Sequence, residues 1–419
     1  MSSTASSQIP SRSELPPGDL WDLSSIYASD EAWEQAFTEL HDLMPRIGTF
    51  RGTLGESAGR LRECLDFMND LRRRQERLGA YAALRMSEDV GDSAAQGRYS
   101  RVVQLAGEID AAASYVSPEI QAVPQQTMER YLEDPQLEDF TIYLRKLLRW
   151  KPHVLSESEE RLLALQTDAN QTAFRSFSAL TNVDMDFGTV RTEDGEVPLS
   201  QSSFGSLMQN RDRDVRESAY HQFYGVFKGH ENTLASLLAG KVNLDIYKAK
   251  ARNFPSAREA ALFPDKVPTA VYDTLIDTVH RNLGTLHRYY TLRKRALQLD
   301  ELRHYDVYVP LQADVEIRHS YEEAVDLITA ALQPLGSEYV DTLRNGLLGG
   351  WVDRYETRGK RSGAFSAGGY DTQPFILMNY KEDVLRDVFT LAHEGGHSMH
   401  SWYSKRSNPF QHYRYTIFE

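Results

Sequence analysis

A long helical periodicity is the feature that most constrains the fold of this 419-residue chain. From about Asp30 to about Leu180, apolar side chains recur at i, i+3, i+4 and i+7, which places them on one face of an α-helix. The clearest series are Leu61, Leu65, Met68, Leu71 and then Leu78, Tyr81, Leu84. This pattern predicts a long helix or a helical hairpin, so the expected fold class is mainly α.

The periodicity changes from helical to alternating near Val183. The stretch VDMDFGTVRTEDGEVPLS alternates on both sides of Glu193-Asp194-Gly195, a sequence that favours a β-hairpin turn. Helical patterns return over residues 215–247 and 268–299. We therefore expect a flexible, Ser- and Pro-rich leader over residues 1–20, an N-terminal helical domain over 21–200, and a second domain over 201–419.

The sequence between these regions also contains a helix-start signal. Ser156 and Glu159 have the spacing of a capping box, in which each side chain accepts a hydrogen bond from the other residue's backbone amide. The apolar Leu162, Leu163 and Leu165 follow. A helix is therefore expected to begin at this point.

Charge and composition exclude several classes of partner. The formal net charge is -13, so nucleic-acid binding through a broad basic face is not expected. One basic run is interpreted as a solvated helix face whose members pair with nearby acids: Arg72, Arg73, Arg74 and Arg77. No run approaches eighteen apolar residues, so we expect no membrane-spanning helix and no membrane partner.

The chain has one cysteine, Cys64, and therefore no internal disulfide. This indicates a reducing compartment, so we expect a cytoplasmic protein. Cys64 falls within the apolar helical series and is interpreted as a small core residue, not a nucleophile.

A short β element is expected before the last helix. The glycine-rich stretch GKRSGAFSAGGY precedes the apolar run Phe375 to Met378, which is bounded by Pro374 and Asn379 and reads as a buried or edge strand. Asn379 and Glu382 resemble an N-cap pair that opens a helix through residues 384–392. The glycines of the preceding loop are expected to form turns that let a peptide backbone pass closely.

The expected helix carries the motif LAHEGGHSMHSW at residues 391–402. His393 and His397 are four residues apart and lie on one face, so both imidazoles can reach a single zinc ion. Glu394 is rotated by about 100° from His393. It can reach a metal-bound water without binding the metal, which suits the general base of peptide hydrolysis.

A zinc site of this kind needs a third protein ligand. His400 lies on the same face as His397 but about 10 Å along the axis from His393, which favours contact with a zinc ligand or with substrate over direct binding to the ion. Glu419 could return to the metal after a loop and a second helix. Gly395 and Gly396 each cost about 1 kcal/mol in a helix interior, which indicates close approach of another helix or of substrate.

These residues resemble a known family. AHEGGHSMHSWYS, preceded by GKRSGAFSAGGYDTQPFILMNY and DVFTLAHE, resembles the oligoendopeptidase F branch of the thimet-oligopeptidase-like zinc peptidases. The resemblance extends through HYDVYVPL and KPHVLSESEERLLA back to LPPGDLWDLSSIY, and so covers nearly the whole chain.

The resemblance implies a mostly α-helical, two-lobed molecule that hydrolyses oligopeptides with one Zn²⁺ ion. It implies that His393 and His397 bind zinc and that Glu394 activates the water. It also places at the substrate cleft the following residues, with His400 as a further candidate: Gly368, Gly369, Tyr370, Phe375 and Asn379.

The chain departs from the family pattern at two places. Gly395 stands where the family usually has a bulky residue, which is expected to alter packing only. The family continues as YTIF-x-A-E-V-A-S with the Glu of the A-E pair as third ligand, so Glu419 falls at the variable position and the ligand lies two residues later. The catalytic domain then reads as incomplete, and weak zinc binding and little turnover are expected of residues 1–419.

Two other interpretations remain open at this point. A non-catalytic peptide-binding or scaffold protein could keep a relict motif, which would be favoured if the full gene also stopped near Glu419 or if its continuation lacked the A-E pair. A helical interaction protein without metal would require both the motif and the long resemblance to be accidental. The sequence indicates neither the preferred peptide bond nor an oligomeric state.

Overall fold

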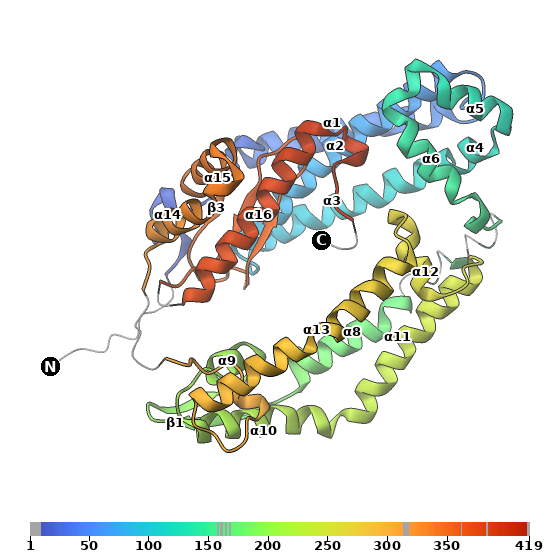
Figure 1. Cartoon of the computed structure of the whole chain (residues 1–419). Helices are drawn as coiled ribbons and strands as arrows, with labels where there is room; N and C mark the ends of the chain where they lie inside the picture. Colours follow the sequence, from blue (N-terminus) through green and yellow to red (C-terminus); the bar gives the residue numbers. More distant parts are fainter. Residues whose placement is uncertain are drawn as a thin grey trace. The chain divides into compact units, whose positions relative to one another are not determined.

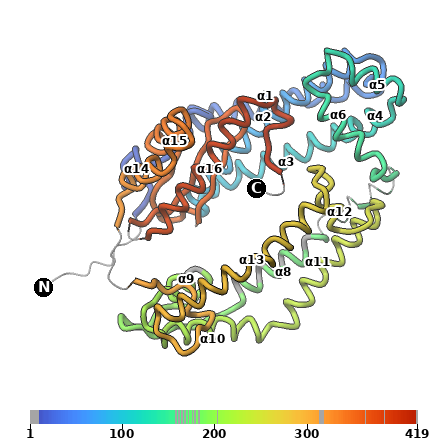
Figure 2. Tube along the Cα trace, in the orientation of Figure 1, coloured from blue at the N-terminus to red at the C-terminus, as the bar shows by residue number. Residues whose placement is uncertain are grey.

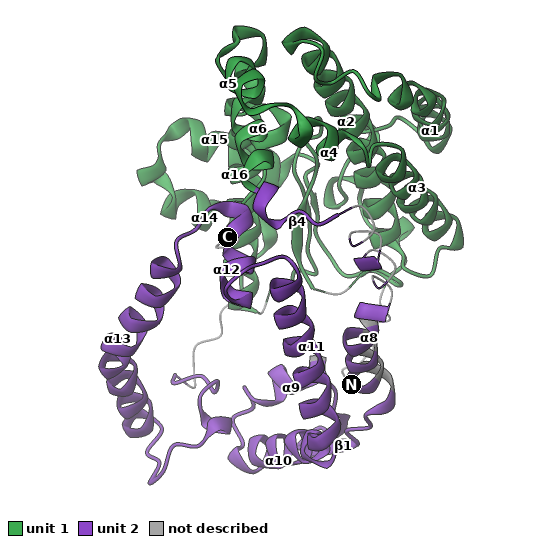
Figure 3. Ribbon diagram, turned by 90° about the vertical axis from the view of Figure 1, so that its right-hand side faces the viewer, with its two compact units in different colours: residues 1–149, 316–416 green, residues 150–315, 417–419 purple. Residues whose placement is uncertain are grey.

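The fold is mainly α-helical, as predicted, in a computed structural model of the chain (Figure 1). The structure describes residues 10–156, 159, 162–163, 166, 169–312, 318–361, 363–382 and 384–416. These residues form two compact units (Figure 3). Unit 1 comprises residues 10–149 and 318–416, and unit 2 comprises the described residues between 150 and 312. These two units do not test the domain boundaries predicted at residues 20 and 200, which stay predictions.

Unit 1 combines helices from both ends of the chain with a small sheet. Its N-terminal helices are α1 Asp30–Leu43, α2 Ala58–Glu88, α3 Ser93–Ala112, α4 Val116–Ala122, α5 Gln125–Glu133 and α6 Thr141–Arg149. The later elements are α14 Tyr321–Ala331, α15 Ser337–Leu348, β3 Val352–Asp353, β4 Phe365–Ala367, β5 Phe375–Leu377 and α16 Leu385–Ser407.

Helix α2 contains the apolar series from which the helical fold was predicted. It begins after Ser57, whose side chain accepts a hydrogen bond from the amide of Arg60 and so satisfies one free donor of the first turn. Its buried residues include Leu61, Leu71 and Leu78, each 0% exposed. The whole series from Leu61 to Leu84 lies in this one 31-residue helix, so the long helix is the predicted alternative that the structure shows. Helix α3 packs along α2, as the Cα trace shows (Figure 2).

The three-stranded sheet of unit 1 has the order β3-β5-β4, with β5 parallel to β3 and antiparallel to β4. Phe375 and Leu377 pack into the core formed with the N-terminal helices, whereas Ile376 and Met378 pack into the core formed with α14, α15 and α16. Because side chains alternate across a strand, both faces of β5 are buried. This explains the unbroken apolar run and confirms the predicted strand.

The described part of the predicted leader, residues 10–20, belongs to unit 1 and contacts other parts of that unit. The Arg12 guanidinium donates to Glu88 at 2.9 Å, and Arg354 pairs with Asp19 at 2.9 Å.

The arginine run on α2 is likewise paired. Arg72 bonds Asp110, Arg73 bonds Asp371 at 2.8 Å, Arg74 bonds Asp70 at 2.9 Å, and Arg77 donates to the carbonyl of Ile26.

Unit 2 contains helices and one hairpin. Its elements are α8 Thr172–Ala179, β1 Thr189–Thr192, β2 Gly195–Pro198, α9 Gln201–Leu207, α10 Arg213–Gly229, α11 Glu231–Ala251, α12 Ala257–Leu262 and α13 Thr269–Ala296. The hairpin confirms the predicted turn, because Thr192 pairs with Gly195 across Glu193 and Asp194. Gly195 has a φ of 121°, which only glycine adopts readily.

The capping box predicted at Ser156 and Glu159 is present. Ser156 donates its amide to Glu159 at 2.9 Å, and the Glu159 amide donates to the Ser156 hydroxyl at 3.4 Å. Part of the helix expected to follow lies outside the described residues. No helix in the described part of the chain is both long and apolar enough to cross a membrane.

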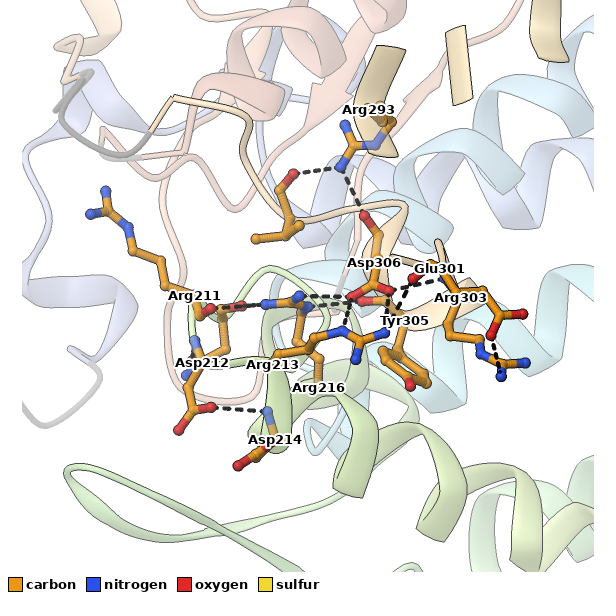
Figure 4. A network of polar contacts seen from close by, with 12 residues as sticks. Arg211, Asp212, Arg213, Asp214, Arg216, Arg293, Glu301, Arg303, Tyr305 and Asp306 are labelled. Atoms are coloured by element: carbon orange, nitrogen blue, oxygen red, sulfur yellow. Dashed lines mark hydrogen bonds and ion pairs between the residues drawn. The ribbon is translucent and has the colours of Figure 1, made fainter. Parts of the chain in front are cut away.

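Asp306 links α10, through its buried carboxylate, to the C-terminal end of α13, through its backbone carbonyl (Figure 4). Its oxygens accept from Arg213 at 3.0 Å and from Arg216 at 2.8 Å. Arg293 of α13 donates to the backbone carbonyls of Asp306 at 3.0 Å and Val309 at 2.6 Å. The paired guanidinium groups hold the pKa of Asp306 below its usual range, although burial alone would raise it.

Candidate active site

Helix α16, which carries the motif, packs against α14, α15 and the strands β4 and β5. Its buried positions include Val388, Leu391 and Ser398, which lie on one face at helical spacing. The predicted start at Asn379 is wrong, since α16 begins at Leu385. The Asn379 amide instead donates to the loop carbonyls of Arg361 at 3.1 Å and Gly363 at 2.8 Å.

The two histidines of the motif are close together. The Nε2 atoms of His393 and His397 are 3.1 Å apart, and their rings are nearly perpendicular at 87°. Two nitrogens that each lie 2.0–2.1 Å from one ion at a tetrahedral angle are about 3.3 Å apart. The pair therefore fits two corners of a tetrahedral zinc site.

Among the described residues, no third ligand lies next to this pair. No group of three or more His, Cys, Asp or Glu side chains placed to hold a metal ion occurs among the described residues. Glu419 lies outside those residues. The His400 ring stacks on Tyr415, with centroids 4.4 Å apart at an interplanar angle of 30°.

Glu394 differs from the two histidines in its surroundings. It is 8% exposed, whereas His393 is exposed and His397 is half-buried. Glu394 precedes Ser398 by four residues, so the two share a helix face. The Ser398 hydroxyl lies 2.8 Å from the Ser366 hydroxyl of β4, so this face of α16 is the one that meets the strand.

Strand β4 is an edge of the sheet. The backbone amides of Ile376 and Met378 donate hydrogen bonds on the side of β3. The N–H and C=O groups of Phe375 and Leu377, which alternate with them, therefore point toward β4. Their partners are Ala367 and Phe365, and the residue between those two, Ser366, therefore directs its N–H and C=O away from β5. An edge of this kind can pair with an extended peptide.

A cavity of about 850 Å³ in unit 1 borders this edge. Its walls come from α2, α3, β4, the end of α16 and the segment after α16, and include Ala83, Val102, Phe365, Ser366, Ala367, Gly368, Ser401 and Tyr415. A larger cavity of about 950 Å³ lies within unit 2 among aromatic side chains. Ser401 of α16 lines the first cavity, whereas His393, Glu394 and His397 are not among its lining residues, so this cavity adjoins the motif along α16 and β4.

The residues predicted at the substrate cleft occupy three different positions. Gly368 lines the cavity and has a φ of 150°, and a Cβ there would lie 3.0 Å from the carbonyl oxygen of Gln373. Tyr370 follows Gly369 in the same loop, and its hydroxyl donates to the Asn408 carbonyl at 3.0 Å. Phe375 is 0% exposed and packs edge-on against Trp21, so the structure gives it a role in the core under the strand.

Two residues that shape this region were not predicted as site residues. Tyr415 stacks on His400, and its hydroxyl donates to the His397 carbonyl at 3.0 Å. Glu76 of α2 accepts from the Tyr370 amide at 2.7 Å, the Arg414 guanidinium at 2.7 Å and the Tyr413 hydroxyl. Glu76 thus joins the glycine-rich loop to the segment after α16.

Burial shifts the pKa of two groups beside Glu76. Burial lowers the pKa of Lys405, near the end of α16, to about 8, and the neighbouring Arg406 charge acts in the same direction. Its ammonium donates to the Thr372 carbonyl. Burial also raises the pKa of the Tyr413 phenol, and the hydrogen bond to Glu76 adds to this effect.

The two glycines of the motif have different environments. A Cβ on Gly395 would lie 3.0 Å from the Cδ1 atom of Leu343 in α15, so the predicted close approach of another helix is confirmed there. A Cβ on Gly396 would meet no atom within 4 Å. Of these two positions, packing among the described residues therefore requires glycine at 395 but not at 396.

Comparison with known proteins identifies the relatives of this chain. The sequence profile of peptidase family M3 matches residues 206–419, and that of oligopeptidase F matches residues 119–187. The oligopeptidase PepF of Bacillus subtilis is 38% identical over 413 residues, which cover 98% of this chain and 62% of that protein. An oligoendopeptidase F homolog of Borreliella burgdorferi is 40% identical over 97% of this chain and 68% of its own length.

Solved structures give the same result for the fold. A protein from Chlamydophila abortus superimposes with a TM-score of 0.83 at 34% identity, covering 98% of this chain and 69% of that one. The oligoendopeptidase-F of Enterococcus faecium has a TM-score of 0.61 at 34% identity over 76% of this chain. The chain thus spans between 62% and 68% of the length of the two curated relatives.

Proposed function

The chain belongs to peptidase family M3, and from this premise we propose that it is the main part of a zinc metalloendopeptidase that hydrolyses oligopeptides. The observation that carries the proposal is the 3.1 Å separation of the His393 and His397 Nε2 atoms beside a buried Glu394. His393 and His397 would hold the ion. The third ligand that the resemblance implies, a carboxylate after Tyr415, lies outside the described residues.

A zinc ion bound there would act as a Lewis acid and lower the pKa of water to about 7. Glu394 would take the proton of the attacking water and later deliver it to the leaving amine. Burial of this carboxylate on a packed helix face fixes its position, so that little ordering is needed during the reaction. Removal of such a general base lowers the reaction rate about 10²–10⁴-fold.

The substrate would lie along the edge of β4. The outward N–H and C=O of Ser366 would pair with an extended peptide, and the adjoining cavity would accept its side chains. Backbone pairing is independent of side-chain identity, so this edge supports oligopeptides of varied sequence as substrates. The free, buried Cys64 and the net charge of -13 support a cytoplasmic enzyme that does not bind nucleic acid.

The test measures zinc content and the cleavage of a quenched fluorescent oligopeptide by the full gene product. We expect Glu394→Gln to keep its zinc and to lose at least about 100-fold in kcat. His400→Ala, which alters the same helix outside the proposed ligand pair, is the matched control and should keep its zinc. Full activity in Glu394→Gln would refute the mechanism, and peptide binding without cleavage by the unmodified protein would favour a non-catalytic peptide-binding protein.

A further inference from the structure

The hydroxyl of Ser398 is a buried polar group to which the proposed mechanism gives no role. Ser398 directly follows His397 on α16, and it is 0% exposed. A hydroxyl withdrawn from water costs free energy unless it is hydrogen-bonded. Its partner is the Ser366 hydroxyl of β4, at 2.8 Å. The interface between α16 and β4 therefore contains a directional contact in addition to apolar packing.

Other buried hydroxyls on helices of unit 1 are satisfied differently. The Ser87 hydroxyl of α2 donates to the Ala83 carbonyl at 2.8 Å. The Thr329 hydroxyl of α14 donates to the Val325 carbonyl at 2.8 Å. Each of these bonds joins residues four apart on one helix, so it fixes nothing outside that helix. The Ser398 bond joins two elements that are 32 residues apart in the chain, and it therefore fixes α16 relative to β4.

Ser366 makes contacts in two directions. Its side chain stands out from the sheet toward α16, whereas its backbone N–H and C=O lie in the plane of the sheet and point away from β5. The proposed function assigns these outward backbone groups to the substrate. A shift of Ser366 relative to Ser398 would therefore move the bound peptide relative to His393 and His397.

A second contact of α16 with the same β-hairpin supports this arrangement. Lys405 follows Ser398 by two helical turns, and its ammonium donates to the Thr372 carbonyl in the loop between β4 and β5. About 10 Å of helix axis separates the two contacts, so together they resist both sliding and rotation of the hairpin. Only the Ser398 contact lies beside the histidines. The alignment at the site therefore depends on the hydroxyl pair.

We propose that the hydroxyl pair of Ser366 and Ser398 positions the substrate peptide relative to the metal, and so fixes which peptide bond faces Glu394. This inference rests on the proposed function. Both serines are positioning residues in this role, since neither hydroxyl touches the substrate or the ion. A hydrogen bond of 2.8 Å tolerates little displacement before it weakens. Misplacement of a substrate by about 1 Å costs an enzyme about 10²-fold in rate.

The test uses the full gene product, supplied with Zn²⁺, and an oligopeptide that it cleaves mainly at one bond. Mass spectrometry identifies the products, and kcat and KM are measured for each variant. Ser366→Ala and Ser398→Ala should each lower kcat at least about tenfold, change KM by about threefold or less, and keep the zinc content. Each should also raise the share of cleavage at neighbouring bonds. The double variant should match the single variants within about twofold, because the two hydroxyls act as one pair.

Two further variants separate positioning from a loss of folding. Ser366→Thr keeps a hydroxyl at the same strand position and should retain kcat and the product pattern. Thr329→Ala removes a buried hydroxyl that bonds its own helix, and should lower stability without changing the product pattern. If Ser398→Ala does not fold, the comparison of Ser366→Ala with Ser366→Thr decides the question.

Three results would overturn the inference. Unchanged kcat and product pattern in both alanine variants would do so and leave the proposed function intact. A double variant whose loss equals the product of the two single losses would show that the hydroxyls act separately. Failure of the unmodified protein to cleave any oligopeptide in the presence of Zn²⁺ would overturn the proposed function, and this inference with it.

Discussion

Helices α16 and α13 are similar in length and in amphipathic pattern but opposite in burial. Six of the 23 residues of α16 are buried, against one of the 28 residues of α13. The covered face of α16 fixes the rotation of the helix, and with it the direction of His393 and His397. Periodicity thus reveals a helix face that requires a partner, whereas the packing partner decides whether the helix can hold a precise site.

The largest expected difference concerns leucines on the two helices. Leu391 of α16 is 0% exposed, and Leu391→Ala should cost about 2–5 kcal/mol in the free energy of unfolding because it leaves a cavity. Leu275 of α13 is 51% exposed, and Leu275→Ala should change that free energy by about 0.5 kcal/mol or less. Urea titrations of both variants measure this. Equal losses would show that α13 is covered in the chain as it stands.

A smaller effect is expected at Glu76, which ties the loop before α16 to the segment after it. Glu76→Gln should cost about 1–3 kcal/mol, since it weakens a charge-assisted set of bonds to Tyr370, Tyr413 and Arg414. Faster amide exchange at residues 413–416 should accompany the loss. Glu63→Gln removes an ion pair of a carboxylate that is 51% exposed, and should cost about 1 kcal/mol or less.

The smallest effects are expected at glycines of the two helices. Gly396→Ala and Gly284→Ala place a methyl group in open space and should each stabilise the protein by about 0.5–1 kcal/mol. Gly395→Ala should gain less, because its methyl group must displace the Leu343 side chain. Thermal unfolding of the three variants ranks them. An equal gain in stability for Gly395→Ala would mean that the Leu343 side chain of α15 moves aside at no energetic cost.

Local signals predicted much of the fold and the core of the motif. The α2 series, the hairpin turn at Glu193-Asp194 and the Ser156 capping box depend on neighbours within a few residues, so their sequence patterns were sufficient. The start of α16 was misplaced because Asn379 bonds a loop 16–18 residues earlier instead of capping a helix. Capping patterns cannot reveal such a competing partner.

Residues whose partners are distant in sequence were not predictable. Glu76 bonds Tyr370 and Arg414, which follow it by 294 and 338 residues, and no local spacing records that contact. Phe375 shows the converse limit. Its place in a family cleft segment suggested substrate contact, but alternation along a strand buried on both faces directs its ring into the core.

Zinc binding by the 419-residue chain, measured by competition with a chromophoric chelator, tests directly whether His393 and His397 hold the metal. We predict weak but specific binding of one ion, because the two proposed ligands on α16 would hold it without the further carboxylate that the resemblance implies. His393→Ala and His397→Ala should each abolish this binding, and His400→Ala should leave it unchanged. Retention of zinc by His393→Ala or His397→Ala would contradict the claim that these two residues hold the metal.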